Sequence, residues 1–251
     1  MGQTGTTGSP GGAPPSVPAG SVIYAVGDIH GEAAKLDRLH AMIRADADGR
    51  APGRRVAIYL GDYVDRGPDS AGVVDRLVGD TLPGFERVFL MGNHEDFLLQ
   101  FLEAASSMSA WFCNGGLRTL ESYDVDLRGY DSWMAEPDDL QEDFRSRLPP
   151  AHMKFFKALD LYRVEGDYLF VHAGIRPGRK LEDQSRADLL WIREAFIHSG
   201  ADHGHVVVHG HTPGDAVEVR PNRIGIDTGA VYGGKLTALV LDGERRAFLQ
   251  A

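Results

Sequence analysis

Three short motifs in the first hundred residues combine glycine with side chains that bind metal ions. They read GDIHG at residues 27–31, GDYVDRG at residues 61–67 and GNHE at residues 92–95. Each follows an apolar run, and its glycine lets the backbone turn sharply and approach an ion closely. Because ligands of α/β domains bind where strands deliver their carboxyl ends into loops, the motifs predict one shared metal site.

Any one of these motifs could be a polar loop that merely ends a strand. That explanation weakens when the same arrangement occurs three times in succession. Two later apolar runs also end in histidine, one at His172 and one in the HGHT segment at residues 209–212. A lone histidine after a strand is usually structural. The small residues beside His172, together with the family resemblance described below, favour a ligand there.

The elements that position these side chains follow from apolar runs and helical periodicity. The sequence predicts strands at residues 21–26, 55–60, 85–91, 161–164, 168–171 and 205–208. It predicts helices at residues 32–43, 68–78 and 96–105. The last two apolar runs, 223–230 and 236–241, are expected to pair with each other around residues 232–234.

In order and spacing, the three motifs resemble those of the calcineurin-like metallophosphoesterases. They are most similar to the bacterial and phage phosphoprotein phosphatases, which are serine/threonine phosphatases, and the symmetrical diadenosine tetraphosphatases share them. The resemblance covers residues 22–241. It implies an α/β fold in which mixed β-sheets form a sandwich flanked by helices. We expect one catalytic domain at residues 21–251, with a small helical cap at residues 112–150.

The resemblance also implies a dinuclear metal centre. Asp28 and His30 would bind the first ion, Asp62 would bridge both ions, and the second ion would be held by Asn93, His172 and His211. These ligands offer only oxygen and nitrogen, and six side chains are too many for a single ion. Mixed carboxylate and imidazole ligands suit manganese, iron or catalytic zinc. We expect two divalent ions, with Mn²⁺ as the first choice.

Further roles near the metals follow from the same resemblance. His94 would protonate the leaving group and Asp65 would orient its ring, although His94 could instead only bind phosphate. Arg66 and Arg193 would bind the phosphate with planar guanidinium groups, unless Arg193 is an ordinary surface charge. Tyr232 would reach the phosphate or form an aromatic rim. His209 is interpreted as a pocket residue outside the ligand set.

These residues predict hydrolysis of phosphoserine and phosphothreonine in proteins through direct attack by a hydroxide that bridges the metals. The alternative substrate is diadenosine tetraphosphate, whose adenine rings could stack on Trp111 or Tyr232. A third possibility is a non-catalytic protein that binds phosphorylated ligands. That possibility predicts a lost ligand or acid, whereas every matching position is present, including the Asp65 and His94 pair.

The composition sets the outer limits. The chain has 251 residues with 43% hydrophobic and 25% charged side chains, which is typical of a globular protein. Its net charge of −10 argues against a nucleic-acid partner. No apolar run is long enough to cross a membrane, and no signal peptide is evident, so we expect a cytoplasmic protein. The sequence does not predict the oligomeric state, and a monomer is assumed.

The first twenty residues differ from the rest. Residues 1–20 consist almost entirely of Gly, Ser, Thr, Pro and Ala. Such a segment buries too little apolar surface to offset its ordering entropy. We therefore predict a disordered tail at residues 1–20.

Overall fold

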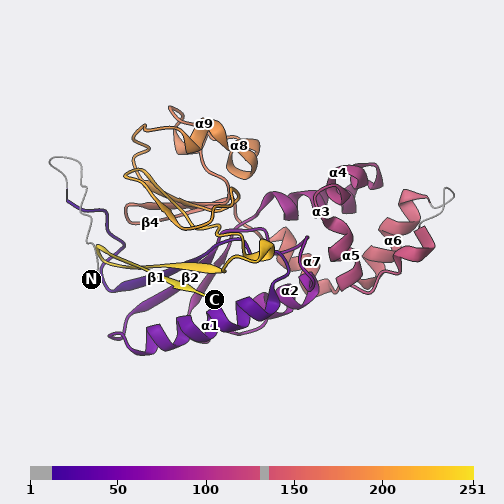
Figure 1. Ribbon diagram of the computed structural model, residues 1–251, viewed down its shortest axis with the longest axis horizontal. Coiled ribbons are helices and arrows are strands. Elements are labelled where there is room, and N and C mark those ends of the chain that lie inside the picture. Colours follow the sequence, from indigo (N-terminus) through magenta and orange to yellow (C-terminus); the bar gives the residue numbers. More distant parts are fainter. Residues whose placement is uncertain (1–12, 131–135) are drawn as a thin grey trace.

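The computed structural model describes residues 13–130 and 136–251 and contains two five-stranded mixed sheets (Figure 1). In the first sheet the strand order is β10 (Arg245–Gln250), β9 (Thr237–Asp242), β1 (Ser21–Val26), β2 (Arg54–Tyr59), β3 (Glu86–Phe89). In the second it is β4 (Tyr162–Glu165), β5 (Tyr168–Val171), β6 (Val206–His209), β8 (Arg223–Gly225), β7 (Glu218–Val219). Neighbours β1, β2 and β3 run parallel, as do β5, β6 and β8.

The two sheets pack face to face, and β1 shows why its sequence is apolar throughout. Ile23 and Ala25 point into the core between the sheets, where they meet Phe170 and Val208 of the second sheet. The alternate side chains, such as Tyr24, point into a second core beneath the helices. A strand that is covered on both faces needs a continuous apolar run rather than alternation.

Helices cover the outer faces of both sheets (Figure 1). The first sheet is covered by α1 (Ala33–Asp48), α2 (Ser70–Val78) and α7 (Pro150–Lys157). The second is covered by α8 (Arg186–Trp191) and α9 (Glu194–Ile197). The predicted fold class, an α/β sandwich of mixed sheets flanked by helices, is therefore confirmed.

A group of helices extends beyond the carboxyl ends of β1, β2 and β3, to the right in Figure 1. It consists of α3 (Asn93–Glu103), α4 (Met108–Phe112), α5 (Gly116–Ser122) and α6 (Pro137–Arg147). Helices α5 and α6 lie in the segment for which we predicted a cap, whereas α4 begins before it. Within the described residues, four short 3₁₀ helices complete the elements, at Ala105–Ser107, Leu127–Tyr130, Leu181–Asp183 and Ala230–Tyr232. No helix in the described ranges is long and apolar enough to span a membrane.

The predicted pairing of the last two apolar runs is wrong. Strand β8 pairs with β6 and β7, whereas β9 pairs with β1 and with β10. The strand β10 was itself not predicted from the sequence. The chain crosses from one sheet to the other between them. Ile224 and Leu239 both point into the core between the sheets, so the two runs face each other across the sandwich. Their apolar pattern fits this arrangement as well as it fits a hairpin.

The predicted disordered tail is too long. Residues 1–12 lie outside the described residues, but the chain is bound to the fold from Pro15 onward, where the carbonyl accepts from the Tyr168 hydroxyl at 3.3 Å. The Ser16 N–H donates to the Asp167 carboxylate at 2.8 Å, and the Val17 N–H donates to the Gly243 carbonyl at 3.2 Å. The Val17 side chain is buried in the core between the sheets. One apolar anchor and several hydrogen bonds, including the Asp167 N–H to the Ser16 carbonyl at 2.9 Å, fix a segment whose composition indicated disorder.

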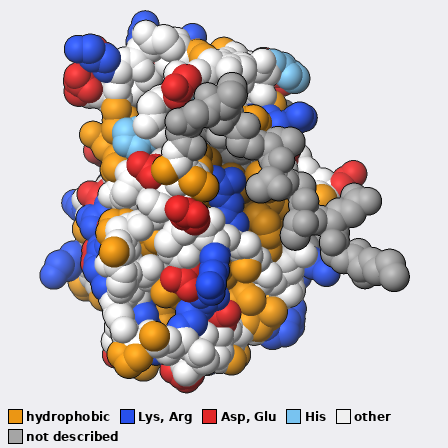
Figure 2. All heavy atoms as spheres, turned by 90° about the vertical axis from the view of Figure 1, so that its left-hand side faces the viewer, with side chains coloured by type: hydrophobic (Ala, Val, Ile, Leu, Met, Phe, Trp, Pro, Cys, Tyr) orange, Lys and Arg blue, Asp and Glu red, His pale blue; other side chains and the backbone are white. Residues whose placement is uncertain are grey.

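The amino ends of the parallel strands lie on the left of Figure 1, and Figure 2 views the molecule from that side. Outside the part covered by grey atoms, basic and acidic side chains are interspersed on this face (Figure 2). One such network joins the sheets, because Arg54 of β2 donates to Glu165 of β4 at 2.8 Å and to Glu86 of β3 at 2.8 Å. The visible part of this face is therefore not uniformly basic.

A buried histidine on α1 should make the stability of the folded protein depend on pH. His40 lies 2.8 Å from the Tyr59 hydroxyl, and burial lowers its pKa to about 4. The unfolded chain takes up a proton near pH 6.5, whereas the folded chain does not, so stability falls as the pH drops from about 6.5 to about 4. In metal-free protein, His40→Gln should reduce this fall by up to about 3 kcal/mol in urea unfolding.

The control is His198→Gln, because His198 is exposed. This control should leave the pH dependence of unfolding as it is in the unsubstituted protein. Identical pH profiles for His40→Gln and the unsubstituted protein would show that His40 is not the group responsible.

Candidate functional site

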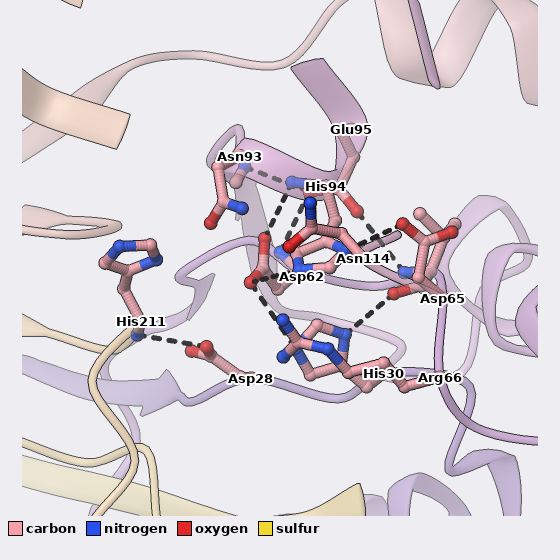
Figure 3. Close-up of polar contacts among 12 residues, drawn as sticks. Asp28, His30, Asp62, Asp65, Arg66, Asn93, His94, Glu95, Asn114 and His211 are labelled. Carbon is pink, nitrogen blue, oxygen red and sulfur yellow. Dashed lines mark hydrogen bonds and ion pairs between the residues drawn. The ribbon is translucent and has the colours of Figure 1, made fainter. Parts of the chain in front are cut away.

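All predicted metal ligands lie where strands of the two sheets end. The loops after β1 and β2 carry Asp28, His30 and Asp62, and α3 begins at Asn93 just after β3. His172 follows β5, and His211 follows the parallel strand β6. Figure 3 shows the side chains of Asp28, Asp62, Asn93 and His211 around a common gap. The structure thus brings together residues that are far apart in sequence.

The backbone of the site is strained. Left-handed φ angles are unusual for residues other than glycine and cost about 1–3 kcal/mol each, so they persist only where the surroundings impose them. Six such residues occur in the described ranges. Five of them are predicted site residues, namely His30, Asp62, Asp65, Arg66 and His211. The strain is concentrated where the sequence predicted chemistry.

Glu95 holds the strained loop after β2, a role that the sequence analysis missed. Its buried carboxylate accepts hydrogen bonds from the N–H groups of Asp62 at 2.8 Å, Tyr63 at 2.7 Å and Gly92 at 2.9 Å. A glutamate in the first turn of a helix commonly bonds to backbone N–H groups at the helix start. That local signal was present in GNHE, but the long-range bonds to the other loop were not visible in it.

The first group of predicted ligands fits a cation. The His30 Nδ1–H donates to the Val64 carbonyl at 2.8 Å, so the Nε2 lone pair points into the site, 3.4 Å from the Asp62 carboxylate. Arg66 also donates to this Nε2 at 2.8 Å. The buried Oδ1 of Asp28 has no hydrogen-bond partner, whereas its Oδ2 accepts from the His211 N–H at 3.0 Å. His30 and Asp62 belong, with His94, to a group whose ligand atoms lie within 4.8 Å of one another and could hold an ion, whereas Asp28 is not in that group and contributes an unpartnered buried oxygen.

The second group has the same character. The His172 Nδ1–H donates to the Leu60 carbonyl at 3.0 Å. Its Nε2 lone pair then faces two other acceptors, the Asn93 Oδ1 at 2.9 Å and an Asp62 oxygen at 3.4 Å. The buried Nε2 of His211 has no partner. Acceptors that face one another repel, and a cation between them removes that repulsion. The residues present therefore fit divalent metal ions.

Electrostatics favour the ligand forms of His30, His211 and Asp62. Burial lowers the pKa of His30 to about 3 and that of His211 to about 2, so both rings are neutral at pH 7. A neutral imidazole is the form that binds metals. Burial opposes ionisation of Asp62, but the neighbouring His172 and His94 lower the pKa of its carboxyl below the usual value. Asp28 differs, because burial and then Asp227 raise its pKa well above the usual value.

The predicted proton donor lies beside this group. The His94 Nδ1 is 2.6 Å from the Asp65 carboxylate, and its buried Nε2 has no partner. Burial opposes a charge on His94, but Asp62 and then Asp65 raise its pKa above the usual value. The Nε2 lies 3.9 Å from Asp62, so His94 also meets a purely geometric criterion for a metal ligand with His30 and Asp62. Like His30 and His172, His94 is held through Nδ1 by an oxygen and points its Nε2 into the site, and its Nδ1 partner is a carboxylate rather than a backbone carbonyl.

The phosphate-binding candidates lie on two sides of the site. The Arg66 guanidinium lies 5.8 Å from the centre of the Tyr232 ring, and this ring is 64% exposed. Arg193 precedes α9, is exposed, and donates to the Thr212 hydroxyl at 3.4 Å. Its positive charge acts on both His172 and His211. His209 is buried against Phe196 and bonds to the Gly210 carbonyl at 3.1 Å.

The aromatic ring that borders the site is Trp191 and not the predicted Trp111. Trp111 is fully buried, so the expectation that it could stack on an adenine ring is wrong. Trp191 is 37% exposed, and its ring centre lies 6.1 Å from that of His211 and 4.9 Å from that of Phe97. The sequence analysis did not single out Trp191. An exposed aromatic ring therefore borders the site, from α8 rather than from the predicted cap.

Comparison with known proteins places these features in a family. The model of the calcineurin-like phosphoesterases matches residues 21–237. An asymmetrical bis(5'-nucleosyl)-tetraphosphatase, PrpE of Anoxybacillus flavithermus, is 28% identical over 85% of this chain and 88% of its own length. Serine/threonine-protein phosphatase 1 of Salmonella typhimurium is 31% identical over 86% of this chain and 89% of its own length.

A solved structure has a similar fold. A crystal structure provisionally described as a diadenosine tetraphosphatase aligns with a TM-score of 0.60. The alignment covers 92% of this chain and 94% of that one, at 23% sequence identity. Similarity at this level of identity shows the fold alone.

Proposed function

The chain belongs to the calcineurin-like phosphoesterase family, and we propose that it is a metal-dependent phosphomonoesterase acting on phosphoserine and phosphothreonine in proteins. The observation that carries this proposal is the His94 and Asp65 pair, 2.6 Å apart beside the predicted metal ligands. A poor leaving group such as an alkoxide needs a proton donor. The similarity to a serine/threonine phosphatase over 86% of this chain supports the same substrate class.

Each predicted residue has a defined task in this proposal. Divalent ions held by the six predicted ligands would supply positive charge for the phosphate oxygens and lower the pKa of water for attack on phosphorus. Arg66 and Arg193 bind the phosphate oxygens from two sides and orient the ester. His94 donates the proton on its Nε2 to the departing alkoxide. Asp65 holds the ring through Nδ1 and stabilises its protonated form.

A second candidate is hydrolysis of dinucleoside tetraphosphates. The exposed Trp191 ring beside His211 favours it, because an aromatic ring can stack on a base for about 1–3 kcal/mol. The similarity to PrpE tetraphosphatases supports it too. This candidate requires the same metal ligands and arginines, so only the substrate separates the two.

A paired assay tests the proposal. Manganese-loaded protein receives a phosphothreonine peptide or diadenosine tetraphosphate at matched concentrations, and we expect the higher kcat/KM for the peptide. Preference for the dinucleotide would refute the phosphoprotein assignment. Its products would then show whether cleavage is symmetrical, giving ADP only, or asymmetrical, giving ATP and AMP.

Trp191→Ala sharpens this comparison. If a base stacks on Trp191, the variant should raise the KM for the dinucleotide by about tenfold or more and change the KM for a short peptide little. Tyr162→Ala is the control, since Tyr162 is an exposed aromatic residue on the edge strand β4. Equal KM values for Trp191→Ala and Tyr162→Ala would show that no base stacks on Trp191.

The proposal includes the remaining expectations. We propose Mn²⁺ as the resident metal because the predicted ligands mix carboxylates with imidazoles. We also propose a monomer that acts in the cytoplasm. Metal analysis of protein purified without added metal tests the first point, and its sedimentation coefficient tests the oligomeric state.

A further inference from the structure

We propose that Trp111 and Thr119 are positioning residues that fix the Asp65 carboxylate and, through it, the His94 ring. Both residues belong to helices α4 and α5, far from the metal-binding motifs in sequence. The inference rests on the proposed function, in which His94 is the proton donor. If it holds, α4 and α5 position the proton donor in addition to bordering the substrate site.

The Asp65 carboxylate is completely buried and accepts hydrogen bonds from three side chains. His94 lies 2.6 Å from its Oδ2. The Trp111 Nε1–H donates to Oδ2 at 2.9 Å and lies 3.0 Å from Oδ1. The Thr119 hydroxyl donates to Oδ1 at 2.5 Å. Two of the three donors therefore come from α4 and α5.

Thr119 also fixes the backbone of Asp65. Its Oγ1 accepts from the Asp65 N–H at 2.9 Å, so one hydroxyl binds both the backbone and the side chain of the same residue. The φ angle of Asp65 is 73°, which needs support from its surroundings. The next residue is held as well, because the Arg66 N–H donates to the Gly115 carbonyl at 3.2 Å. The turn between α4 and α5 thus closes on the strained loop.

These bonds leave the carboxylate one orientation. A carboxylate that loses a donor in a buried site rotates toward the remaining donors or leaves a lone pair unsatisfied, at a cost of about 1–3 kcal/mol. Asp65 is the one hydrogen-bond partner of the His94 ring in the described residues. Any rotation of Asp65 therefore changes the direction in which the His94 Nε2 points.

A purely structural role is the competing explanation, in which Trp111 and Thr119 only satisfy a buried charge. The two explanations differ in what a substitution does to the reaction. A substitution that only destabilises the fold slows the hydrolysis of all substrates alike. Loss of acid positioning slows esters with a poor leaving group more than esters with a good one, because only the former need the proton.

The test compares Thr119→Val, which keeps the shape and removes the hydroxyl, with Thr119→Ser, which keeps the hydroxyl. Substrates are an alkyl phosphate and p-nitrophenyl phosphate. We expect Thr119→Val to lower kcat for the alkyl ester by about 10–100-fold with little change in KM, and to lower it much less for the nitrophenyl ester. Thr119→Ser should restore most of the alkyl activity. Trp111→Phe, which removes the N–H and keeps an aromatic ring, should behave as Thr119→Val does.

A double-mutant cycle completes the test. In a His94→Asn background, Thr119→Val should change the alkyl rate by less than about twofold, because the group it positions is gone. The downfield proton resonance expected for the His94 Nδ1–H should shift in Thr119→Val and vanish in His94→Asn.

Equal slowing of both esters by Thr119→Val and Trp111→Phe, or additivity with His94→Asn, overturns the inference while the proposed function stands. If His94→Asn itself shows no leaving-group selectivity, the acid role fails, and the positioning roles fail with it. Metal content and thermal unfolding of each variant are measured alongside. An unfolded Thr119→Val leaves the decision to Trp111→Phe.

Discussion

Asp62→Asn is expected to lower turnover by about a thousandfold or more and to reduce the bound divalent metal in the same preparation. One Asp62 oxygen lies 3.4 Å from the His30 Nε2 and the other 3.4 Å from the His172 Nε2, so the carboxylate stands between the two groups of ligands. An amide offers one weaker oxygen and no negative charge. Several kcal/mol of charge stabilisation are then lost, and each 1.36 kcal/mol corresponds to about a tenfold change in rate.

The Asp62→Asn variant should lose activity without losing its fold. Asparagine tolerates left-handed backbone, so the φ of 52° at Asp62 remains accessible, and circular dichroism should be unchanged. Asp37→Asn is the control, because Asp37 forms a surface ion pair with Arg76 on the far helices. It should keep full activity and metal content. Full activity in purified Asp62→Asn would overturn the assignment of this cluster as the metal centre.

His94→Asn is expected to retain its metal ions and to slow alkyl phosphate esters about 100-fold or more, with a much smaller effect on nitrophenyl esters. General acid catalysis contributes about 10²–10⁴-fold where the leaving group is poor. His94 bonds to Asp65 through Nδ1, and its Nε2 is the free atom that can donate. The measurements are kcat for both esters and metal content by elemental analysis.

Two results would contradict this assignment. Equal slowing of both esters would mean that His94 binds phosphate or supports the site without donating a proton. Loss of metal would mean that His94 is a ligand, as its 3.9 Å distance from Asp62 permits geometrically. His198→Asn, on the exposed end of α9, is the matched histidine control and should change neither property.

Much of the site was predictable because its signals are local. Each predicted ligand after β1, β2 and β3 lies within a few residues of a strand end that the apolar pattern marks. Parallel strands bring their carboxyl ends to one edge, so correct strands were enough to place Asp28, Asp62 and Asn93 together. The strained φ angles at the same loops agree with that prediction.

Other features depend on contacts that no local pattern encodes. The apolar run at β9 fits a hairpin with β8 or a place beside β1, and only packing between the sheets decides. Val17 fixes a segment whose composition indicates disorder. In the sequence Trp111 could be an aromatic residue that stacks on a substrate base, yet its N–H is bonded to the Asp65 carboxylate, 46 residues away in sequence.

The sequence by itself therefore determined the fold class, the family and the edge of the sheets where the predicted metal ligands gather, because these follow from short runs of residues. The tertiary structure alone decided how those side chains are held. Glu95 secures the loop of Asp62, and Thr119 and Trp111 secure Asp65, across separations of 33, 54 and 46 residues. Such bonds form only when the chain has folded, because folding brings each donor next to its acceptor in a site that is shielded from water.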